Sequence, residues 1–204
     1  MTAIVLRPRA PLWPRLCQRV TAWFAAAAAA PPAEVSADVV AAARQGDHGA
    51  FARIVSHYDH QLRGLAFRVL GDQARMDDVM QDAYVKAFQA LPRFKGDARL
   101  GTWLFRITYN ACIDEVRRAG RRETTPFSRP DHALPADAAI EGVDLTAALG
   151  KLPPDQRAAV LLVDAYGYDY AEAAAILGVR EGTVGSRLTR ARTALRTTLG
   201  WSER

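Results

Sequence analysis

The residues best suited to chemistry lie near the C-terminus, where arginine and hydroxyl side chains recur at helical spacing. One side of a helix over residues 181–199 would carry apolar side chains, at Val184, Leu188, Ala191 and Leu195. The other side would expose Ser186, Arg187, Thr189, Arg190 and Arg196. Because arginine and hydroxyl groups bond to phosphates and base edges, this exposed side is suited to the major groove of DNA.

A helix-turn-helix would hold that side in place. Asp169 is a suitable N-cap and Glu172 follows three residues later, which predicts a capping box before a helix over Tyr170–Leu177. Gly178 can adopt the left-handed conformation that ends this helix. A second helix over about Glu181–Leu199 would then cross the first, as in DNA-binding proteins. The alternative is an alanine-rich helical hairpin with a solvated arginine face.

A second candidate set lies on a helix predicted over Thr102–Ala119. One side of it would carry Trp103, Arg106, Asn110, Asp114 and Arg117, and the cluster continues with Arg118, Arg121 and Arg122. An aromatic surface, an amide and several arginines suit single-stranded or melted nucleic acid. The loop of residues 94–101 before this helix contains two glycines and is long enough to hold an unstacked base. For Trp103 alone, a place in the core is the alternative.

The helix predicted over Gln73–Leu91 has an acidic stripe in its first turns. Its polar side carries Asp78, Gln81, Asp82, Lys86 and Gln89. Acids in the first turns stabilise a helix through its dipole, which is one explanation of the stripe. The other is a docking surface for a basic partner.

The composition narrows the class of protein. The 204 residues carry a formal net charge of +5, which suits a polyanionic partner. Cys17 and Cys112 lie far apart and have no ligands at metal-binding spacing, so we expect no disulfide, no metal site and a cytoplasmic location. No apolar run is long enough to span a membrane. The four histidines form no catalytic cluster and no glycine-rich phosphate loop is present, so we expect no enzyme, no cofactor and no small-molecule substrate.

The chain is predicted to be all-α, with two small helical domains joined by a flexible linker. Further helices are expected over residues 37–45, 49–57 and 60–70, and over 143–152 and 154–166. The expected divisions are an N-terminal extension over 1–36, a first domain over 37–119, a proline-containing linker over 120–142 and a second domain over 143–200. The extension is basic and then alanine-rich, like a weak export signal, but we expect it to be disordered.

From Val39 to Leu199 the sequence resembles the extracytoplasmic-function, or group 4, sigma factors of bacterial RNA polymerase, within the sigma-70 family. MDDVMQDAYVKAFQALPRF, residues 76–94, resembles region 2.2 of the family. FKGDARLGTWLFRITYNACIDEVRR, residues 94–118, resembles regions 2.3 and 2.4. LPPDQRAAVLLVDAYGYDYAEAAAILGVREGTVGSRLTRAR, residues 152–192, is similar to region 4. The motifs stand in the order that the family has.

The resemblance implies three sets of contacts. Core RNA polymerase would be bound by Asp77, Asp78, Gln81 and Asp82. The melted minus-ten promoter element would be bound by Phe94, Lys95, Arg99, Trp103, Arg106, Asn110, Asp114, Arg117 and Arg118. The double-stranded minus-thirty-five element would be bound by Arg180, Thr183, Ser186, Arg187, Thr189 and Arg190. Gly185 departs from the pattern, because the family usually has lysine or arginine there.

These features predict a sigma factor that binds core polymerase, recognises and melts promoter DNA, and is controlled by an anti-sigma factor, without inserting into a membrane. The main alternative is a stand-alone helix-turn-helix transcription regulator. Such a regulator has no use for an acidic docking helix followed by a strand-binding helix, so the first domain distinguishes the two. An enzyme is the third and least supported class.

Overall fold

The computed structural model describes residues 34–122 and 145–200, and all of the regular structure in these ranges is helical. The first unit contains α2 (Ala37–Arg44), α3 (His48–Leu70), α4 (Gln73–Ala90), a short 3₁₀ turn (Leu91–Arg93) and α5 (Leu100–Arg122). The second unit contains α6 (Leu145–Gly150), α7 (Pro154–Val160), a π-helical turn called η2 (Leu161–Ala165), α8 (Tyr170–Leu177) and α9 (Glu181–Thr198). The all-α prediction with two helical units is confirmed.

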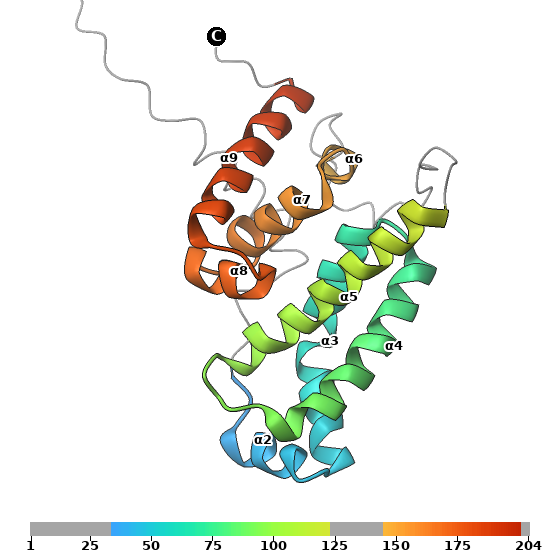
Figure 1. The fold of residues 1–204 in the computed structure, drawn as a ribbon, viewed down its shortest axis with the longest axis vertical. Coiled ribbons are helices and arrows are strands. Elements are labelled where there is room, and N and C mark those ends of the chain that lie inside the picture. The colour runs from blue at the N-terminus through green and yellow to red at the C-terminus, as the bar shows by residue number, and fades with distance from the viewer. Residues whose placement is uncertain (1–33, 123–144, 201–204) are drawn as a thin grey trace, which may run out of the picture.

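Helices α3, α4 and α5 pack against one another in the first unit (Figure 1). α3 begins at Asp47, whose carboxylate accepts from the backbone N–H groups of Gly49 and Ala50. We expected two helices here, with a break before His60, and that expectation is wrong. No glycine or proline interrupts residues 57–60, and Tyr58 is fully buried one turn after Ile54, so the apolar side of one helix is continuous.

The second unit also differs from the sequence prediction in one helix. A single helix was expected over residues 154–166, but α7 passes into η2, where the N–H of Tyr166 donates to the carbonyl of Leu161. The chain then turns at Gly167, which has φ +71°. α8 and α9 follow this turn, and both pack against α7.

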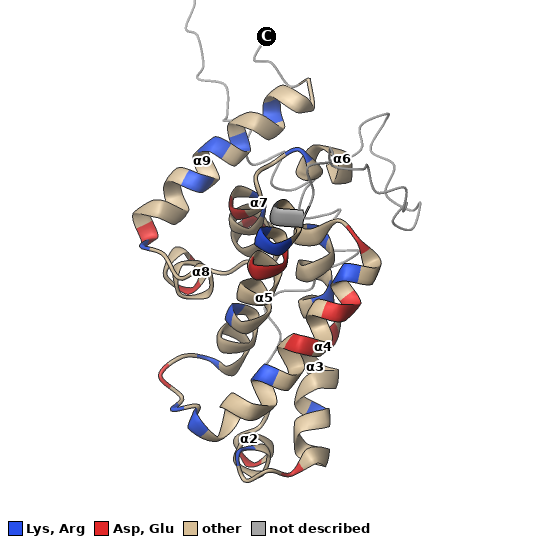
Figure 2. Cartoon of the chain, turned by 45° about the vertical axis from the view of Figure 1, so that its right-hand side comes forward, with Lys and Arg blue, Asp and Glu red and all other residues tan. Residues whose placement is uncertain are grey.

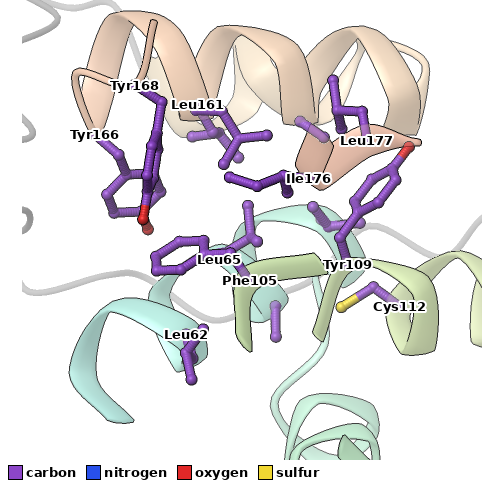
Figure 3. Packing of buried hydrophobic residues seen from close by; sticks show 14 of the residues in the cluster. Leu62, Leu65, Phe105, Tyr109, Cys112, Leu161, Tyr166, Tyr168, Ile176 and Leu177 are labelled. Atoms are coloured by element: carbon purple, nitrogen blue, oxygen red, sulfur yellow. The ribbon is translucent and has the colours of Figure 1, made fainter. Parts of the chain in front are cut away.

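The two units pack directly against each other, α8 on α5 and α7 on α3. Figure 3 shows the buried contact, in which Phe105 of α5 meets Tyr166 and Tyr168. Both ring pairs are edge-to-face, with centroids 5.5 and 5.3 Å apart. Most of the expected extension and linker lies outside the described residues, although α5 continues to Arg122, three residues beyond the expected end at Ala119.

Candidate polymerase and nucleic-acid interfaces

The acidic stripe of α4 forms an exposed surface, coloured red in Figure 2. Asp78, Gln81 and Asp82 all lie exposed on it, while Met76, Met80 and their apolar neighbours are buried on the other side. Val85 stands one turn further along and is 56% exposed. A single exposed valine is common on protein surfaces, so Val85 does not by itself mark a docking surface. Its exposure was not predicted from the sequence, although its position off the apolar side of the helix is a usable signal.

Asp77 has a different environment from its three predicted companions. Its carboxylate pairs with the guanidinium of Arg63 on α3, which also donates to Asp59 at 2.9 Å. The hydroxyl of Tyr84 donates to the same Asp59 at 2.6 Å. Asp77 therefore ties α4 to α3, and the exposed part of the acidic stripe begins at Asp78.

The candidate strand-binding side of α5 is mostly exposed. Arg106, Asn110, Asp114 and Arg117 all face solvent, as expected. Arg118 is half-buried and lies 3.5 Å from Glu115, and Arg117 lies 3.9 Å from Asp114. Exposed pairs of this kind contribute little to stability, so these arginines stay available to phosphates.

Trp103 is neither fully buried nor fully exposed. The ring is half-buried against the core and contacts Phe94, with ring centroids 5.2 Å apart and an angle of 46° between the planes. The two rings thus form a partly exposed aromatic pair where the loop of residues 94–101 joins α5. Such a pair can stack on an unpaired base.

Arg99 is held by two carboxylates. Its Nε donates to Glu34 at 2.9 Å, and a terminal nitrogen lies 3.5 Å from Glu172 of α8. Lys95, in the same loop, is exposed. Because Glu172 belongs to the second unit, the loop is joined to the helix-turn-helix by an ion pair that the sequence did not predict.

The helix-turn-helix is built as predicted. The backbone N–H of Glu172 donates to Asp169 at 2.8 Å, and the N–H of Asp169 donates back to the Glu172 carboxylate at 3.2 Å. Gly178 ends α8 with φ +66°. The predicted apolar side of α9 is buried, at Val184, Leu188, Ala191 and Leu195.

The opposite side of α9 carries much of the expected polar set. Arg180, Ser186, Thr189 and Arg190 are exposed, and Thr183 is half-buried. The hydroxyls of Ser186 and Thr189 donate to carbonyls one turn back, at 3.0 Å each, which fixes their orientation. Within α9, Arg190 is the exposed arginine of the set predicted to contact the minus-thirty-five element.

Arg187 does not face outward as predicted. Its side chain is 19% exposed and its Nε lies 3.0 Å from the carboxylate of Asp155 on α7. The sequence gave no sign of this pair, because Asp155 is 32 positions away. A neighbouring pair, Arg192 with Asp164, fixes α9 on η2 through contacts of 2.6 and 3.2 Å. Burial raises the pKa of Asp164, while the guanidinium of Arg192 opposes that shift.

Within the described residues we searched for membrane-spanning helices and for metal-binding clusters. No helix in them is both long and apolar enough to cross a bilayer. Nor do three or more histidine, cysteine, aspartate or glutamate side chains gather there as a metal ion would require.

Each of the two helical units matches a family model. The family model described as Sigma-70 region 2 matches residues 54–122, and the one described as Sigma-70, region 4 matches residues 143–195. The ECF RNA polymerase sigma factor SigM of Mycobacterium tuberculosis is 39% identical over 167 residues, which is 81% of this chain and 85% of that protein. The ECF RNA polymerase sigma-E factor of Escherichia coli is 33% identical over 172 residues, or 74% of this chain and 87% of that protein.

Two solved structures are similar over most of the chain. The sigma factor RpoE of Bartonella quintana, in complex with the anti-sigma factor NepR, is 31% identical with a TM-score of 0.65 and covers 75% of this chain and 98% of that one. CnrH, in complex with the cytosolic domain of CnrY, is 30% identical with a TM-score of 0.60 and covers 81% of this chain and 97% of that one.

Proposed function

This chain belongs to the extracytoplasmic-function sigma factors of the sigma-70 family. From that membership we propose which of its surfaces binds core RNA polymerase and which bind promoter DNA in transcription initiation. The exposed stripe of Asp78, Gln81, Asp82 and Val85 binds core RNA polymerase. The exposed side of α5 and the aromatic pair before it bind the melted minus-ten element. The exposed side of α9 binds the double-stranded minus-thirty-five element.

One observation carries this proposal: an exposed acidic docking surface and two basic helix faces occur in the same chain. The net charge of +5 draws the protein to DNA, whereas the stripe on α4 concentrates negative charge for a basic protein partner. A stand-alone helix-turn-helix regulator is not favoured, because region 2 matches as well as region 4. The protein acts by binding and positioning, and we propose that it performs no catalysis of its own.

The individual contacts follow from exposure and chemistry. Asp77, whose side chain is itself partly exposed, joins the polymerase surface to α3 through its pair with Arg63. In the minus-ten set, Asn110 and Asp114 offer hydrogen bonds to base edges, and Arg106, Arg117 and Arg118 offer charge to phosphates. In the minus-thirty-five set, Arg190 contacts bases and Arg180 contacts the backbone.

The polymerase surface is tested by removing its charge. The double variant Asp78→Asn, Asp82→Asn should lower the affinity for core polymerase about tenfold, which is on the order of 1.4 kcal/mol. Affinity is measured by fluorescence titration, and function by run-off transcription over a library of promoters.

A matched control separates this effect from a change in net charge. Ala52→Lys with Ser56→Lys also raises the net charge by two, at exposed positions one turn apart on α3. This control should bind core polymerase like the wild type. If the aspartate variant also binds like the wild type, α4 is not the docking surface.

We also propose that an anti-sigma factor controls this chain. The support is the similarity to RpoE, which was solved in complex with the anti-sigma factor NepR. A protein captured by the tagged full-length chain from its native cells should abolish run-off transcription when added before core polymerase. A captured protein that leaves transcription unchanged is not the regulator.

A further inference from the structure

We propose that Glu34 is a positioning residue for the loop of residues 94–101. Its carboxylate holds Arg99, so that Arg99 anchors the end of the loop and does not itself contact a phosphate. Glu34 lies three residues before α2, outside residues 54–122 that match Sigma-70 region 2. The consequence for DNA binding rests on the proposed function, whereas the anchoring of the loop does not.

The loop is joined to the N-terminal segment of the first unit at both of its ends. It begins after the 3₁₀ turn of residues 91–93, which packs against α2. It ends at Arg99, whose Nε donates to Glu34 at 2.9 Å. In Figure 1 the chain enters α2 beside this loop, so residues 34–44 run from the end of the loop to its beginning. Between the two contacts lie residues 95–98, all of which are exposed.

The buried ring of Tyr58 on α3 supports both Glu34 and the end of the loop. A Cβ built on Gly101 would lie 3.1 Å from Cε1 of Tyr58, so the backbone shortly after Arg99 lies directly on this ring. Burial, together with the nearby Glu34 carboxylate, raises the pKa of Tyr58 to about 12. Val35, the next residue, is half-buried against the core. The position of Glu34 therefore does not depend on Arg99 alone.

Two carboxylates beside Arg99 oppose a contact between this residue and a phosphate. Its side chain is 46% exposed, yet its Nε is bonded to Glu34 and a terminal nitrogen lies 3.5 Å from Glu172. A phosphate would have to displace one of these acids and lie next to the other, and like charges placed together are unfavourable. Lys95 is exposed on the same loop and offers its charge to the strand. Arg99 is therefore better suited to fix the loop that presents Lys95.

An anchored loop favours the binding of a base, because it has less conformational entropy to lose when the base enters. The pair of Glu34 and Arg99 is weak, since both side chains are about four-tenths exposed, so the expected effect is a few-fold change. Attraction to any single strand is mainly electrostatic and does not require an ordered loop. Loosening the loop should therefore lower the preference for particular bases more than the affinity for single strands in general.

The order of the loop is measured by ¹⁵N relaxation on the full chain. In Glu34→Gln the order parameters of the backbone amides at residues 95–98 should fall by on the order of 0.1, toward the flexible range. Asp38→Asn is the matched control, because it removes the same charge from the next acid along the chain, which is also exposed and lies beside Ser36. This control should leave the loop as it is in the wild type. Unchanged order parameters in Glu34→Gln overturn the anchoring.

Two further variants show whether Glu34 acts through Arg99. Arg99→Gln should loosen the loop at least as much as Glu34→Gln does, and the double variant should be no looser than Arg99→Gln alone. Glu172→Gln should have a smaller effect, because its contact with Arg99 is longer and glutamine preserves the capping box of α8. Additive effects of Glu34→Gln and Arg99→Gln, or an equal effect of Glu172→Gln, overturn the assignment to Glu34.

The consequence for DNA binding is tested with fluorescent single-stranded decamers at one salt concentration. The affinity for a decamer that the wild-type chain selects from a random library is divided by the affinity for the unselected mixture. Glu34→Gln should lower this ratio about threefold, whereas Asp38→Asn should keep it. An unchanged ratio alongside a loosened loop overturns the role of Glu34 in base selection. If the wild type prefers no decamer, the proposed minus-ten function fails, while the anchoring is still judged by the order parameters.

Discussion

Arg187 and Arg190 lie three residues apart on α9 but in different surroundings. Arg190 is exposed, while Arg187 is 19% exposed and paired with Asp155. We expect Arg190→Ala to lower the affinity for a minus-thirty-five duplex by about 1 to 3 kcal/mol and to relax the preference at one base position, because a bidentate base contact is lost. Binding to a set of single-base variants measures both effects.

Arg187→Ala is the comparison for that experiment. If Arg187 leaves Asp155 to contact a phosphate, its loss should weaken all duplexes alike and reduce the slope of log affinity against log salt by about one. A uniform loss for Arg190→Ala as well would show that Arg190 contacts the backbone and not a base.

Asn110 is the exposed amide of α5. Asn110→Ala should reduce promoter opening more than closed-complex binding, because an amide on this helix reaches base edges only once the strands part. Permanganate footprinting of the melted region, at protein concentrations that saturate binding, measures opening by itself. Arg106→Ala, one turn earlier and charged, is the comparison and should affect binding at least as much as opening. Unchanged melting in Asn110→Ala would remove this amide from the minus-ten site.

At the scale of single elements, α9 is weakened by Gly185, one of the two glycines in its first half. A Cβ at Gly185 would meet only Tyr170 Cε2, at 3.8 Å, which is ordinary van der Waals contact. Gly185→Ala should therefore raise the free energy of unfolding by about 1 kcal/mol, because alanine favours a helix more than glycine does. Urea unfolding followed by circular dichroism gives the change.

Gly178→Ala, in the same helix-turn-helix, should change the stability in the opposite direction. Gly178 has φ +66°, a conformation that alanine adopts only with strain, so this variant should be less stable than the wild type. If both alanine variants shifted stability in the same direction, helix propensity would not be the dominant effect at Gly185.

The elements that the sequence predicted well are those fixed by local chemistry. The capping box of Asp169 and Glu172 and the left-handed Gly178 depend on residues at most four positions apart, so their pattern is visible in the sequence. The continuity of α3 was also visible locally, because no glycine or proline interrupts residues 57–60 and Tyr58 continues the apolar side of the helix. The π-helical turn η2 has no comparable local pattern, and its Asp164 pairs with Arg192 of α9, 28 positions away.

In the candidate sites too, features set by a local pattern were predictable, whereas contacts between distant elements were not. Exposure of Asn110 and Arg190 followed from helical periodicity, and both predictions were correct. The partners of Arg99 and Arg187 come from other elements and were not predictable from spacing. Arg157 of α7 donates to α3 carbonyls 88 and 89 positions away, so the packing of the two units is visible only in three dimensions.

At the scale of the whole molecule, the rate at which the Cys112 thiol is labelled can show when the two helical units separate. Its side chain is fully buried on the stripe of α5 that also carries Phe105 and Tyr109, and Figure 3 places it beside Tyr109. Burial raises the pKa of its thiol to about 12. At pH 8 only about one molecule in ten thousand would then hold the reactive thiolate, so the folded protein should react very slowly with thiol reagents.

In a Cys17→Ser background, labelling of Cys112 should therefore require an opening event. If opening separates the units and leaves each one folded, it exposes less surface than complete unfolding, and the logarithm of the labelling rate should rise less steeply with urea than the unfolding equilibrium does. The exposed Thr193→Cys, combined with Cys112→Ala, supplies the rate for an unprotected thiol. Equal urea slopes for labelling and unfolding would mean that Cys112 becomes accessible only when the entire chain unfolds, and that the contact between the units is as stable as the domains themselves.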